Sequence, residues 1–594
     1  MPVYNAPIRD MRFVFYELLD GAELQQLPGF DEVDEETLVA ILEEAGRFCA
    51  EQLLPINRSG DEEACCYEDG SVRTPQGFKT TYTAFIKAGW NSIAFDPEYG
   101  GQGLPKSLHV MVDEMINATN MSFGLYPGLT HGAWTALSSY ASDRLKDHYF
   151  PKMAEGIWSG TMCLTEPHSG TDLALLRTKA VPQDDGSYLI SGSKIFITAG
   201  EHDLTENIVH LVLARTPDAP PGIKGISLFL VPKLLDDNQG KPKTPNGVSC
   251  GSIEHKMGIK ASATCTMNFD SAQGWLVGEV NQGMRAMFKM MNTERLAVGI
   301  QGIGIAEAAY QNAAHYARER LQGRAPGGAT HPDLPADPLT VHPDVRRMLL
   351  TMRSYAQGMR ALGLWIAREL DIAGKHPDAD RRRQADGFIA LMTPVAKALF
   401  TDLGTEVANL GVQVFGGHGY IREHGMEQFV RDARIAQLYE GTNGIQAMDL
   451  AGRKLPMEDG RLIRHLLDPI NAYLDSRAHD ERLTKFVEPL KTATIQLDRA
   501  TTHILQAGRN APAEIGSAAT PYLRLLGITA LAYLWARMAE TGLAGSHGTE
   551  AEFYRAKVKT ARFFIEHLLP QTHGLTASVL AGASSLMDFD DEAW

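Results

Sequence analysis

The segment Arg431–Asn443 reads RDARIAQLYEGTN and places a carboxylate, Glu440, directly after an apolar, helix-like stretch and before a glycine. A carboxylate on a loop at the end of such a stretch can lie in an apolar pocket. Desolvation there raises the pKa of the carboxyl toward neutrality, which suits a general base. A solvated glutamate at a helix end shows the same local pattern. This segment alone therefore leaves a catalytic and an ordinary interpretation open.

Two segments upstream offer surfaces that suit a flat ring or a phosphate. Residues 162–172, MCLTEPHSGTD, combine small hydroxyl residues with Gly170, so that hydroxyls and backbone N–H groups lie close together. Residues 194–200, KIFITAG, place Phe196 and Thr198 two apart and therefore on one face of a strand. In isolation, the favoured interpretations are a strand followed by a polar turn for the first segment and an ordinary half-buried strand for the second.

A third segment, Val414–Tyr420, reads VFGGHGY and has three glycines in four residues. The cap at the end of a helix explains one glycine but not three. We therefore expect another backbone or a cofactor to approach this turn closely.

Length and composition limit the classes of protein. The chain has 594 residues, which predicts several packed units. Its net charge of −16 argues against a protein that binds nucleic acid through phosphate contacts and against binding to anionic membrane surfaces. Six irregularly spaced cysteines favour a reducing compartment over a disulfide scaffold and match no metal-binding pattern. We find no secretory signal, and no stretch approaches the roughly 20 apolar residues of a membrane span. The nearest, residues 523–536, is typical of a buried helix, so we expect a soluble, cytoplasmic protein without a metal.

The pattern along the chain changes from helical to β and back to helical. Short β-like runs lie between about Ser159 and Val280, and a Gly-, Pro- and Asp-rich loop at Gly323–Pro343 interrupts the later helices as either a functional or a disordered segment. The fold class predicted is α+β and multidomain. The domains expected are an N-terminal arm at 1–33, a helical domain at 34–158, a β domain at 159–283, a helical bundle at 284–455 and an extra helical domain at 456–594.

Taken together, the segments Cys163–Asp172, Gln413–Tyr420 and Arg431–Asn443, in this order, resemble the acyl-CoA dehydrogenase family. The resemblance covers about Asp34 to Leu455, roughly 70% of the chain. It implies an N-terminal helical domain, a middle antiparallel β-barrel-like domain and a C-terminal four-helix bundle. It also implies that FAD lies between the β domain and the last helices.

The resemblance assigns roles to individual residues. FAD contacts fall on Met162, Leu164, Thr165, Gly170, Thr171, Phe196, Thr198, Thr442 and Asn443. Contacts with the FAD of a neighbouring subunit fall on Arg320, Gln322, Gln413, Gly416 and Gly417. Contacts with the CoA part of the substrate fall on Thr171, Asn292 and Arg295. This chain departs from the family where Gln322 replaces a frequent hydroxyl residue, Asn292 a common aspartate and His168 a frequent glycine.

The same resemblance implies the reaction. Glu440 matches the base that removes the α-proton of the thioester while the flavin accepts the hydride from Cβ, which yields a trans-2-enoyl-CoA. The enolate oxygen is expected to accept hydrogen bonds from the flavin ribityl chain and from the backbone N–H of Glu440. Electron-transfer flavoprotein is the expected electron acceptor.

Three segments are additions to the common form of the family: the arm at 1–33, the loop at Gly323–Pro343 and the region at 456–594. With them, the chain resembles a longer bacterial branch. That branch includes dehydrogenases of fatty acyl-CoA, as in β-oxidation, and of 3-(methylthio)propanoyl-CoA. Added C-terminal helices favour a homodimer, because in the family they cover the surface that pairs two dimers. Gly124 and Gly128 fall where the acyl channel ends. They either leave space for a medium or long chain, which we favour, or only permit close helix packing.

Two other functions fit parts of the pattern. Acyl-CoA oxidases share the fold but usually differ in the organisation of the chain, and the order of regions here fits dehydrogenases better. A flavin-free binding protein requires loss of the base, and Glu440 is present.

Overall fold

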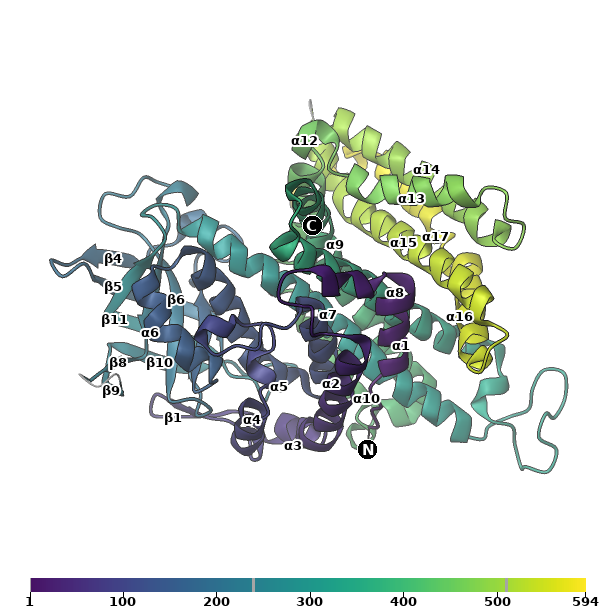
Figure 1. The fold of residues 1–594 in the computed structure, drawn as a ribbon, viewed down its shortest axis with the longest axis horizontal. Coiled ribbons are helices and arrows are strands. Elements are labelled where there is room, and N and C mark those ends of the chain that lie inside the picture. The colour runs from purple at the N-terminus through teal and green to yellow at the C-terminus, as the bar shows by residue number, and fades with distance from the viewer. Residues whose placement is uncertain (1, 238–240, 508–510, 594) are drawn as a thin grey trace. The chain divides into compact units, whose positions relative to one another are not determined.

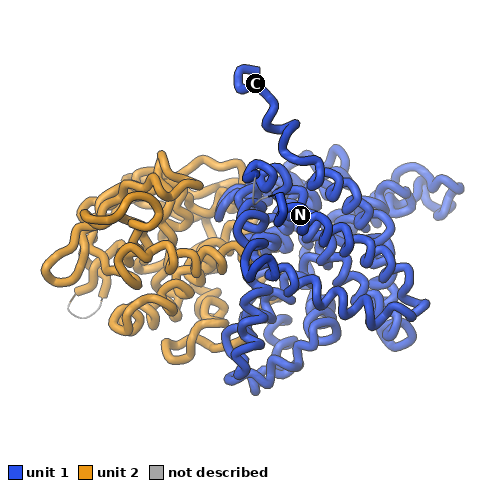
Figure 2. Tube along the Cα trace, turned by 90° about the horizontal axis from the view of Figure 1, so that it is seen from above, with its two compact units in different colours: residues 1–44, 106–114, 298–594 blue, residues 45–105, 115–297 orange. Residues whose placement is uncertain are grey.

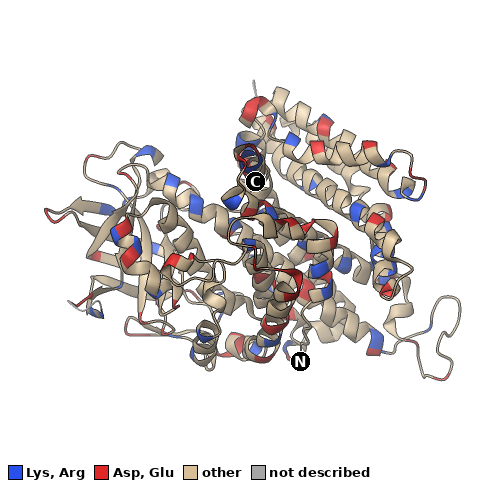
Figure 3. Ribbon diagram, viewed as in Figure 1, with Lys and Arg blue, Asp and Glu red and all other residues tan. Residues whose placement is uncertain are grey.

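The computed structural model describes residues 2–237, 241–507 and 511–593 (Figure 1). The chain forms two compact units, coloured separately in Figure 2. Unit 1 contains residues 1–44, 106–114 and 298–594, and unit 2 contains residues 45–105 and 115–297. Unit 2 joins helices to a β domain and unit 1 is helical, which confirms the predicted multidomain α+β class. Acidic and basic residues are interspersed along both units (Figure 3).

A seven-stranded sheet forms the centre of unit 2. Its path runs β3, β6, β7, β11, β5, β4, with β10 on β11. The strands are β3 (Trp158–Cys163), β4 (Lys179–Pro182), β5 (Tyr188–Thr198), β6 (Asn207–Ala214), β7 (Ser227–Pro232), β10 (Val248–Ile253) and β11 (Thr264–Val277). The pairs are antiparallel except β3 with β6, which is parallel, so the predicted antiparallel domain has one parallel pair.

The sheet curls until its edge strand meets its middle. The N–H of Ala180 on β4 donates to the carbonyl of Arg215, just after β6, at 2.8 Å, and the N–H of Arg215 donates to the carbonyl of Thr178 at 2.9 Å. Every residue of β6 and β7 is buried, as expected for strands covered on both faces. The prediction of a barrel-like domain therefore agrees with the observed curvature. Two hairpins, β1 (Cys66–Glu68) with β2 (Ser71–Arg73) and β8 (Leu234–Asp236) with β9 (Pro242–Pro245), lie outside this sheet.

Helices complete unit 2, and one of them is broken. They are α3 (Pro55–Glu63), α4 (Phe78–Lys87), α6 (Asp143–Ala154) and the larger part of α5 (Lys106–Tyr140). Inside α5, Asn120 has non-helical angles, with φ −160° and ψ 85°. Its Oδ1 accepts from the N–H of Phe123 at 3.0 Å, and its Nδ2 donates to the carbonyl of Leu53 at 3.3 Å. The side-chain oxygen thus supplies an acceptor for the Phe123 N–H at the break, and the side-chain amide ties the break to Leu53.

The helical bundle of unit 1 is built on α7 (Gly283–Glu319, in unit 1 from residue 298), α8 (Pro343–Lys375) and α9 (Ala379–Phe415). Two short helices follow, α10 (Met426–Ile435) and α11 (Asn443–Met448). Helices α7 and α9 approach closely at Gly302 and Gly404, where a Cβ added to Gly404 would lie 2.6 Å from the Gly302 carbonyl oxygen. Glycine is needed there because the two backbones touch.

The C-terminal helices of unit 1 pack on this bundle. They are α13 (Arg464–Arg477), α14 (Thr484–Ala507), α15 (Pro512–Gly545), α16 (Ala551–Phe563) and α17 (Gln571–Leu580). Helix α15 is buried along most of its length, as predicted for residues 523–536. The indole N–H of Trp535 donates to the carbonyl of Ser354 on α8 at 3.2 Å. By length and hydropathy, the segment nearest to a membrane span is not residues 523–536 but Ala379–Tyr420, which includes α9. In the described chain this region alone is long and apolar enough, and 83% of its most apolar window is buried.

The N-terminal arm contains a short helix, α1 (Ile8–Arg12), followed by a mostly buried π-helical segment at Phe13–Leu18. The ring of Phe13 meets the ring of Phe553 on α16 edge-on at 5.5 Å. Asp10 enters a buried ionic cluster with Arg360 of α8 and Lys557 of α16. The arm is therefore anchored in the core of unit 1.

The loop at Gly323–Pro343 is ordered around the buried side chain of Asp337. Its carboxylate accepts from the backbone N–H groups of Ala325, Thr330 and His331 at 2.8 to 3.1 Å. Burial opposes ionisation, but these hydrogen bonds lower the pKa of Asp337. These hydrogen bonds give the loop a defined conformation around Asp337.

Candidate active site

Glu440 lies in a turn whose backbone is held in an unfavourable conformation. The turn connects α10 to α11, and both Glu440 and Gly441 have positive φ, 56° and 85°. For a residue with a Cβ, this left-handed region costs roughly 1–2 kcal/mol. Such a conformation persists where the surroundings impose it, and it clusters at functional sites.

Three hydrogen bonds impose the turn. The backbone N–H of Asn443 donates to the carbonyl of Gln437 at 3.1 Å and closes it. The side-chain amide of Gln446, which is fully buried, donates to the carbonyl of Glu440 at 3.0 Å. The hydroxyl of Thr442 caps α11 by accepting from the N–H of Ile445 at 3.4 Å. Glu440 is half-buried in this turn.

The glycine-rich turn after α9 exposes bare backbone. A Cβ added at Gly416 or Gly417 would meet nothing within 4 Å, so an open surface lies beside both residues. Gly416 has φ 61° and ψ −139°, which glycine alone adopts readily. This is the open backbone that the three glycines predicted.

Tyr316 joins this turn to the end of α7. Its ring stacks on Phe415 with centroids 4.0 Å apart, and its hydroxyl lies 2.8 Å from Nδ1 of His418. The N–H of Arg320, at the end of α7, donates to the Tyr316 carbonyl at 2.8 Å. The structure thus gathers the residues predicted to meet a neighbour's FAD at one end of the bundle, all of them exposed: Arg320, Gln322, Gln413, Gly416 and Gly417.

In unit 2, the first two predicted segments lie side by side. The N–H of Ile195 donates to the carbonyl of Thr165 at 2.9 Å, and the hydroxyl of Thr161 donates to the carbonyl of Thr198 at 2.5 Å. These bonds bring Met162, Leu164 and Thr165 next to Phe196 and Thr198. Gly170, with nothing within 4 Å of an added Cβ, and Thr171 lie exposed in the turn that follows.

Phe196 projects its ring outward from a bulge. Its φ is 58°, and the pairing of β5 with β11 shifts register between Lys194 and Ile197. Phe196 is 59% exposed although it is aromatic, while Lys194, two positions earlier, is fully buried. A large exposed ring beside hydroxyl groups is the surface that a flat heteroaromatic ligand requires.

A buried ion pair supports this surface from below. Nζ of Lys194 donates to Oε1 of Glu166 at 2.9 Å and to the carbonyl of Leu164 at 3.0 Å. Glu166 also accepts from the N–H groups of Arg177 and Thr178 and from the Thr178 hydroxyl. Burial alone would raise the pKa of Glu166, but the charge of Lys194 and these hydrogen bonds outweigh it and lower the pKa to about 2.

The residues predicted to meet CoA lie on separate elements of unit 2. Asn292 is exposed and Arg295 is buried on the first part of α7, three positions apart and so on one face of the helix. Thr171 lies in the turn of the β domain. Near the expected end of the acyl channel, a Cβ added to Gly124 would lie 3.1 Å from Asn117 and Ile116. A Cβ added to Gly128 would meet nothing within 4 Å.

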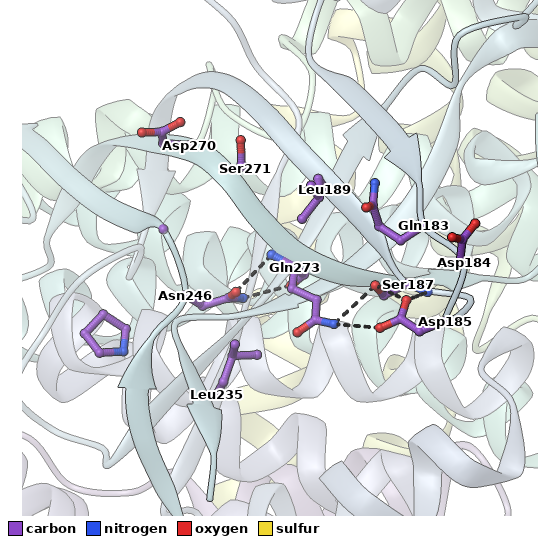
Figure 4. Close-up of a pocket in the computed structure, with 12 residues that line it drawn as sticks. Gln183, Asp184, Asp185, Ser187, Leu189, Leu235, Asn246, Asp270, Ser271 and Gln273 are labelled. Atoms are coloured by element: carbon purple, nitrogen blue, oxygen red, sulfur yellow. Dashed lines mark hydrogen bonds between the residues drawn. The ribbon is translucent and has the colours of Figure 1, made fainter.

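A separate pocket of about 610 Å³ lies in the β domain, where the turn at Asp184–Asp185, Asn246 and Gln273 line it (Figure 4). The Nδ2 of Asn246 donates there to the carbonyl of Gln273 at 2.8 Å, and its Oδ1 accepts from the Gln273 N–H at 2.9 Å. The side-chain amide of Gln273 donates to Asp185 and Ser187. None of the predicted site residues lines this pocket. It is not the candidate site.

Comparison with known proteins decides the family. Four sequence models match in order: acyl-CoA dehydrogenase N-terminal domain at residues 35–157, middle domain at 161–272 and C-terminal domain at 281–455, then acetyl-CoA dehydrogenase C-terminal like at 466–590. A 3-methylmercaptopropionyl-CoA dehydrogenase of Ruegeria pomeroyi is 44% identical, over 98% of this chain and 99% of that protein. The chain belongs to the acyl-CoA dehydrogenase family.

Other relatives agree with this membership. The broad-specificity linear acyl-CoA dehydrogenase FadE5 of Mycobacterium tuberculosis is 34% identical over the full length of both chains. Two solved structures share the fold. Caenorhabditis elegans ACDH-11 in complex with C11-CoA has a TM-score of 0.77, 19% identity and covers 95% of this chain and 91% of its own. An acyl-CoA dehydrogenase of Bacillus anthracis complexed with FAD has a TM-score of 0.73, 20% identity and covers 96% and 91%.

This acyl-CoA dehydrogenase is an FAD-dependent enzyme. The residues present fit the cofactor in each unit: the exposed ring of Phe196 beside Thr165 and Thr198 suits the flavin ring, and the bare backbone at Gly416 and Gly417 suits a closely approaching group. The buried lysines Lys194 and Lys397 were not predicted as site residues. A signal for Lys397 was present, because it is the lone charge in the apolar run Val395–Phe400.

Proposed function

We propose that Glu440 removes the α-proton of an acyl-CoA thioester and that the product is a trans-2-enoyl-CoA. The observation that carries the proposal is the conformation of Glu440, a non-glycine residue with φ 56° whose carbonyl is held by the buried amide of Gln446. A base must be fixed relative to a weakly acidic C–H group, because proton removal depends on orientation as well as on pKa. Bound FAD supplies the acceptor for the hydride that leaves Cβ.

The protein's own groups divide the remaining tasks. Phe196, Thr165 and Thr198 form the surface proposed for the flavin, and Arg295 is proposed for CoA. The side-chain amide of Asn443 is directed to α9, where it contacts Lys397 and Asp402. The contact of Asn443 with FAD is therefore proposed for its backbone, and that of Thr442 for the same turn.

The acyl group is proposed on two observations. The relative at 44% identity is a 3-methylmercaptopropionyl-CoA dehydrogenase, which makes the short 3-(methylthio)propanoyl group the first substrate to test. The open space beside Gly128 supports the alternative, a medium or long fatty acyl group as in β-oxidation, whereas the tight surroundings of Gly124 indicate close helix packing.

The assembly proposed is a cytoplasmic homodimer that passes electrons to electron-transfer flavoprotein. Tyr420 and Ile421, which follow the glycine-rich turn, are 85% and 45% exposed although they are apolar, and a second subunit would cover them. The packing of α13–α17 on the bundle supports a dimer over a tetramer. Light scattering of the purified holoenzyme tests this proposal, and a monomer or a tetramer would contradict it.

Anaerobic bleaching of the flavin tests the reaction and the substrate together. The purified holoenzyme is mixed with acyl-CoAs that carry 3-(methylthio)propanoyl, butyryl, octanoyl, palmitoyl or a branched chain. With the preferred acyl group, we expect the flavin to bleach within seconds of mixing. The colour should return when electron-transfer flavoprotein is added. Absence of bleaching with every linear and thioether substrate would contradict the proposal. Rapid oxygen consumption without that acceptor would assign an oxidase instead.

A further inference from the structure

A lysine is fully buried in the middle of α9. Lys397 has no exposed surface and lies between Ala396 and Ala398 in an apolar stretch of the helix. Lysine is almost never completely buried unless its ammonium group is paired, because the charge loses its hydration. The position of Lys397 therefore calls for an explanation in terms of what its Nζ binds.

The ammonium group of Lys397 donates to the amide oxygen of Asn443 at 2.8 Å. On its other side, the Nδ2 of Asn443 donates to Oδ1 of Asp402 at 2.7 Å. An ammonium group only donates and a carboxylate only accepts, so the two charges together allow one orientation of the amide. The hydroxyl of Thr401 adds a contact with Nδ2 at 3.0 Å.

The same carboxylate holds the other end of the Glu440 turn. Oδ1 of Asp402 accepts from the side-chain amide of Gln437 at 2.6 Å, and the carbonyl of Gln437 accepts from the N–H of Asn443 at 3.1 Å. Gln437 and Asn443 are the first and last residues of the turn that contains Glu440. Both ends are thus fastened to Asp402 of α9, five residues after Lys397.

We propose that Lys397, acting through Asn443 and with Asp402, is a positioning residue for Glu440. The proposal rests on the proposed role of Glu440 as the base. The left-handed conformation at Glu440 is unfavourable, so the turn would relax if one end were released. Without the ammonium group, the oxygen of the Asn443 amide loses its charged donor at 2.8 Å and keeps the longer contact with the Thr401 hydroxyl at 3.4 Å. The carboxylate of Glu440 would then spend less time in the orientation needed for proton removal.

The test compares Lys397→Met with a matched control on the same helix. Methionine keeps most of the aliphatic side chain and removes the charge. Thr393→Val removes a buried hydroxyl four residues earlier, whose partner is the carbonyl of Ile389. Each variant is first loaded with FAD. We then measure the limiting rate of anaerobic bleaching, the apparent affinity for acyl-CoA, the flavin content and the thermal midpoint.

We expect Lys397→Met to lower the limiting bleaching rate by about 10- to 100-fold, with the affinity for acyl-CoA changed less than about threefold. Thr393→Val should keep the wild-type rate. A role in stability alone would lower the thermal midpoint of Lys397→Met and leave the rate of its FAD-loaded form unchanged, and this result would overturn the proposal.

Two further variants make the outcome decisive. Asp402→Asn, at a half-buried position, removes the charge at the other side of the amide and replaces Lys397→Met if that variant does not fold. A wild-type rate in FAD-loaded Asp402→Asn would then overturn the proposal. Glu440→Gln distinguishes failure of the proposed base from failure of the proposed positioning role of Lys397. If it bleaches normally, the base is wrongly assigned; if it does not bleach while Lys397→Met is fast, only the positioning role fails.

Discussion

The guanidinium of Arg360 on α8 lies 2.5 Å from the carboxylate of Asp10 in the N-terminal arm, and both side chains are buried. Arg360 also pairs with Glu114 and Glu307, and Lys557 of α16 pairs with Asp10. One cluster therefore connects the arm, the bundle and the C-terminal helices within unit 1. The arm and the C-terminal helices are additions to the common form of the family, and the cluster ties both of them to the helical bundle.

Removal of one charge from this cluster should destabilise the protein strongly. Asp10→Asn leaves Arg360 and Lys557 with one buried carboxylate fewer, and loss of one partner of a buried pair costs about 3–5 kcal/mol. Urea unfolding at neutral pH measures the change. The control is Glu35→Gln, which breaks an exposed pair with Arg12 of the same arm and should cost less than about 1 kcal/mol. Equal effects of the two substitutions would contradict a structural role for the cluster.

The low pKa of Glu166 predicts a loss of stability in acid. Its folded-state pKa of about 2 lies below its ordinary value of 4.5, so the contribution of its ionised form is complete above about pH 4.5 and disappears as the pH falls toward 2. The shift corresponds to about 3 kcal/mol. The difference in unfolding free energy between wild type and Glu166→Gln, measured from pH 6 to pH 3, should shrink with falling pH. A difference that stays constant would show that Glu166 is not held as described.

The exposed ring of Phe196 should contribute to FAD binding and little to folding. Phe196→Ala removes an aromatic surface that is 59% exposed, so the thermal midpoint of the FAD-free protein should hardly change. The affinity for FAD should fall about tenfold, because a stacked aromatic contact is worth roughly 1 kcal/mol beyond its buried area. Flavin fluorescence titration measures the affinity. Val181→Ala, at an exposed apolar position on β4 of the same sheet, should leave it unchanged.

Gly128 tests the alternative of a long acyl channel. Gly128→Ala should stabilise the helix by about 0.5–1 kcal/mol, since nothing lies within 4 Å of the added methyl group. Gly128→Leu should slow bleaching by octanoyl- and palmitoyl-CoA and spare 3-(methylthio)propanoyl-CoA if the open space receives the acyl chain. If Gly128→Ala and Gly128→Leu changed the bleaching rate equally for all three acyl-CoAs, Gly128 would serve helix packing alone.

Much of the architecture could be predicted because it depends on local pattern. The β-like runs predicted between about Ser159 and Val280 include β6 and β7, since β-branched and aromatic residues bounded by turns favour strands. The parallel pairing of β3 with β6 could not be inferred. It depends on which strands become neighbours, and Met162 and Leu211 are far apart in sequence.

The candidate site divides in the same way. The motif around Glu440 was recognisable because its neighbours are adjacent in sequence. The restraint on its backbone was not, since Lys397 and Asn443 are 46 positions apart and meet through the packing of α9 on α11. The bulge that directs Phe196 outward and Lys194 inward also escaped prediction, because a strict two-residue alternation places both on one face.

The anaerobic bleaching rate of Glu440→Gln tests the central claim most directly. The substitution keeps the size of the side chain and removes the ability to accept the α-proton, so FAD content and acyl-CoA affinity should stay near the wild-type values. We predict that bleaching by the preferred acyl-CoA slows by about 10²- to 10⁴-fold, the contribution of a positioned general base, because this proposal places no second group to replace Glu440. Wild-type bleaching in Glu440→Gln would contradict the assignment of Glu440 as the base.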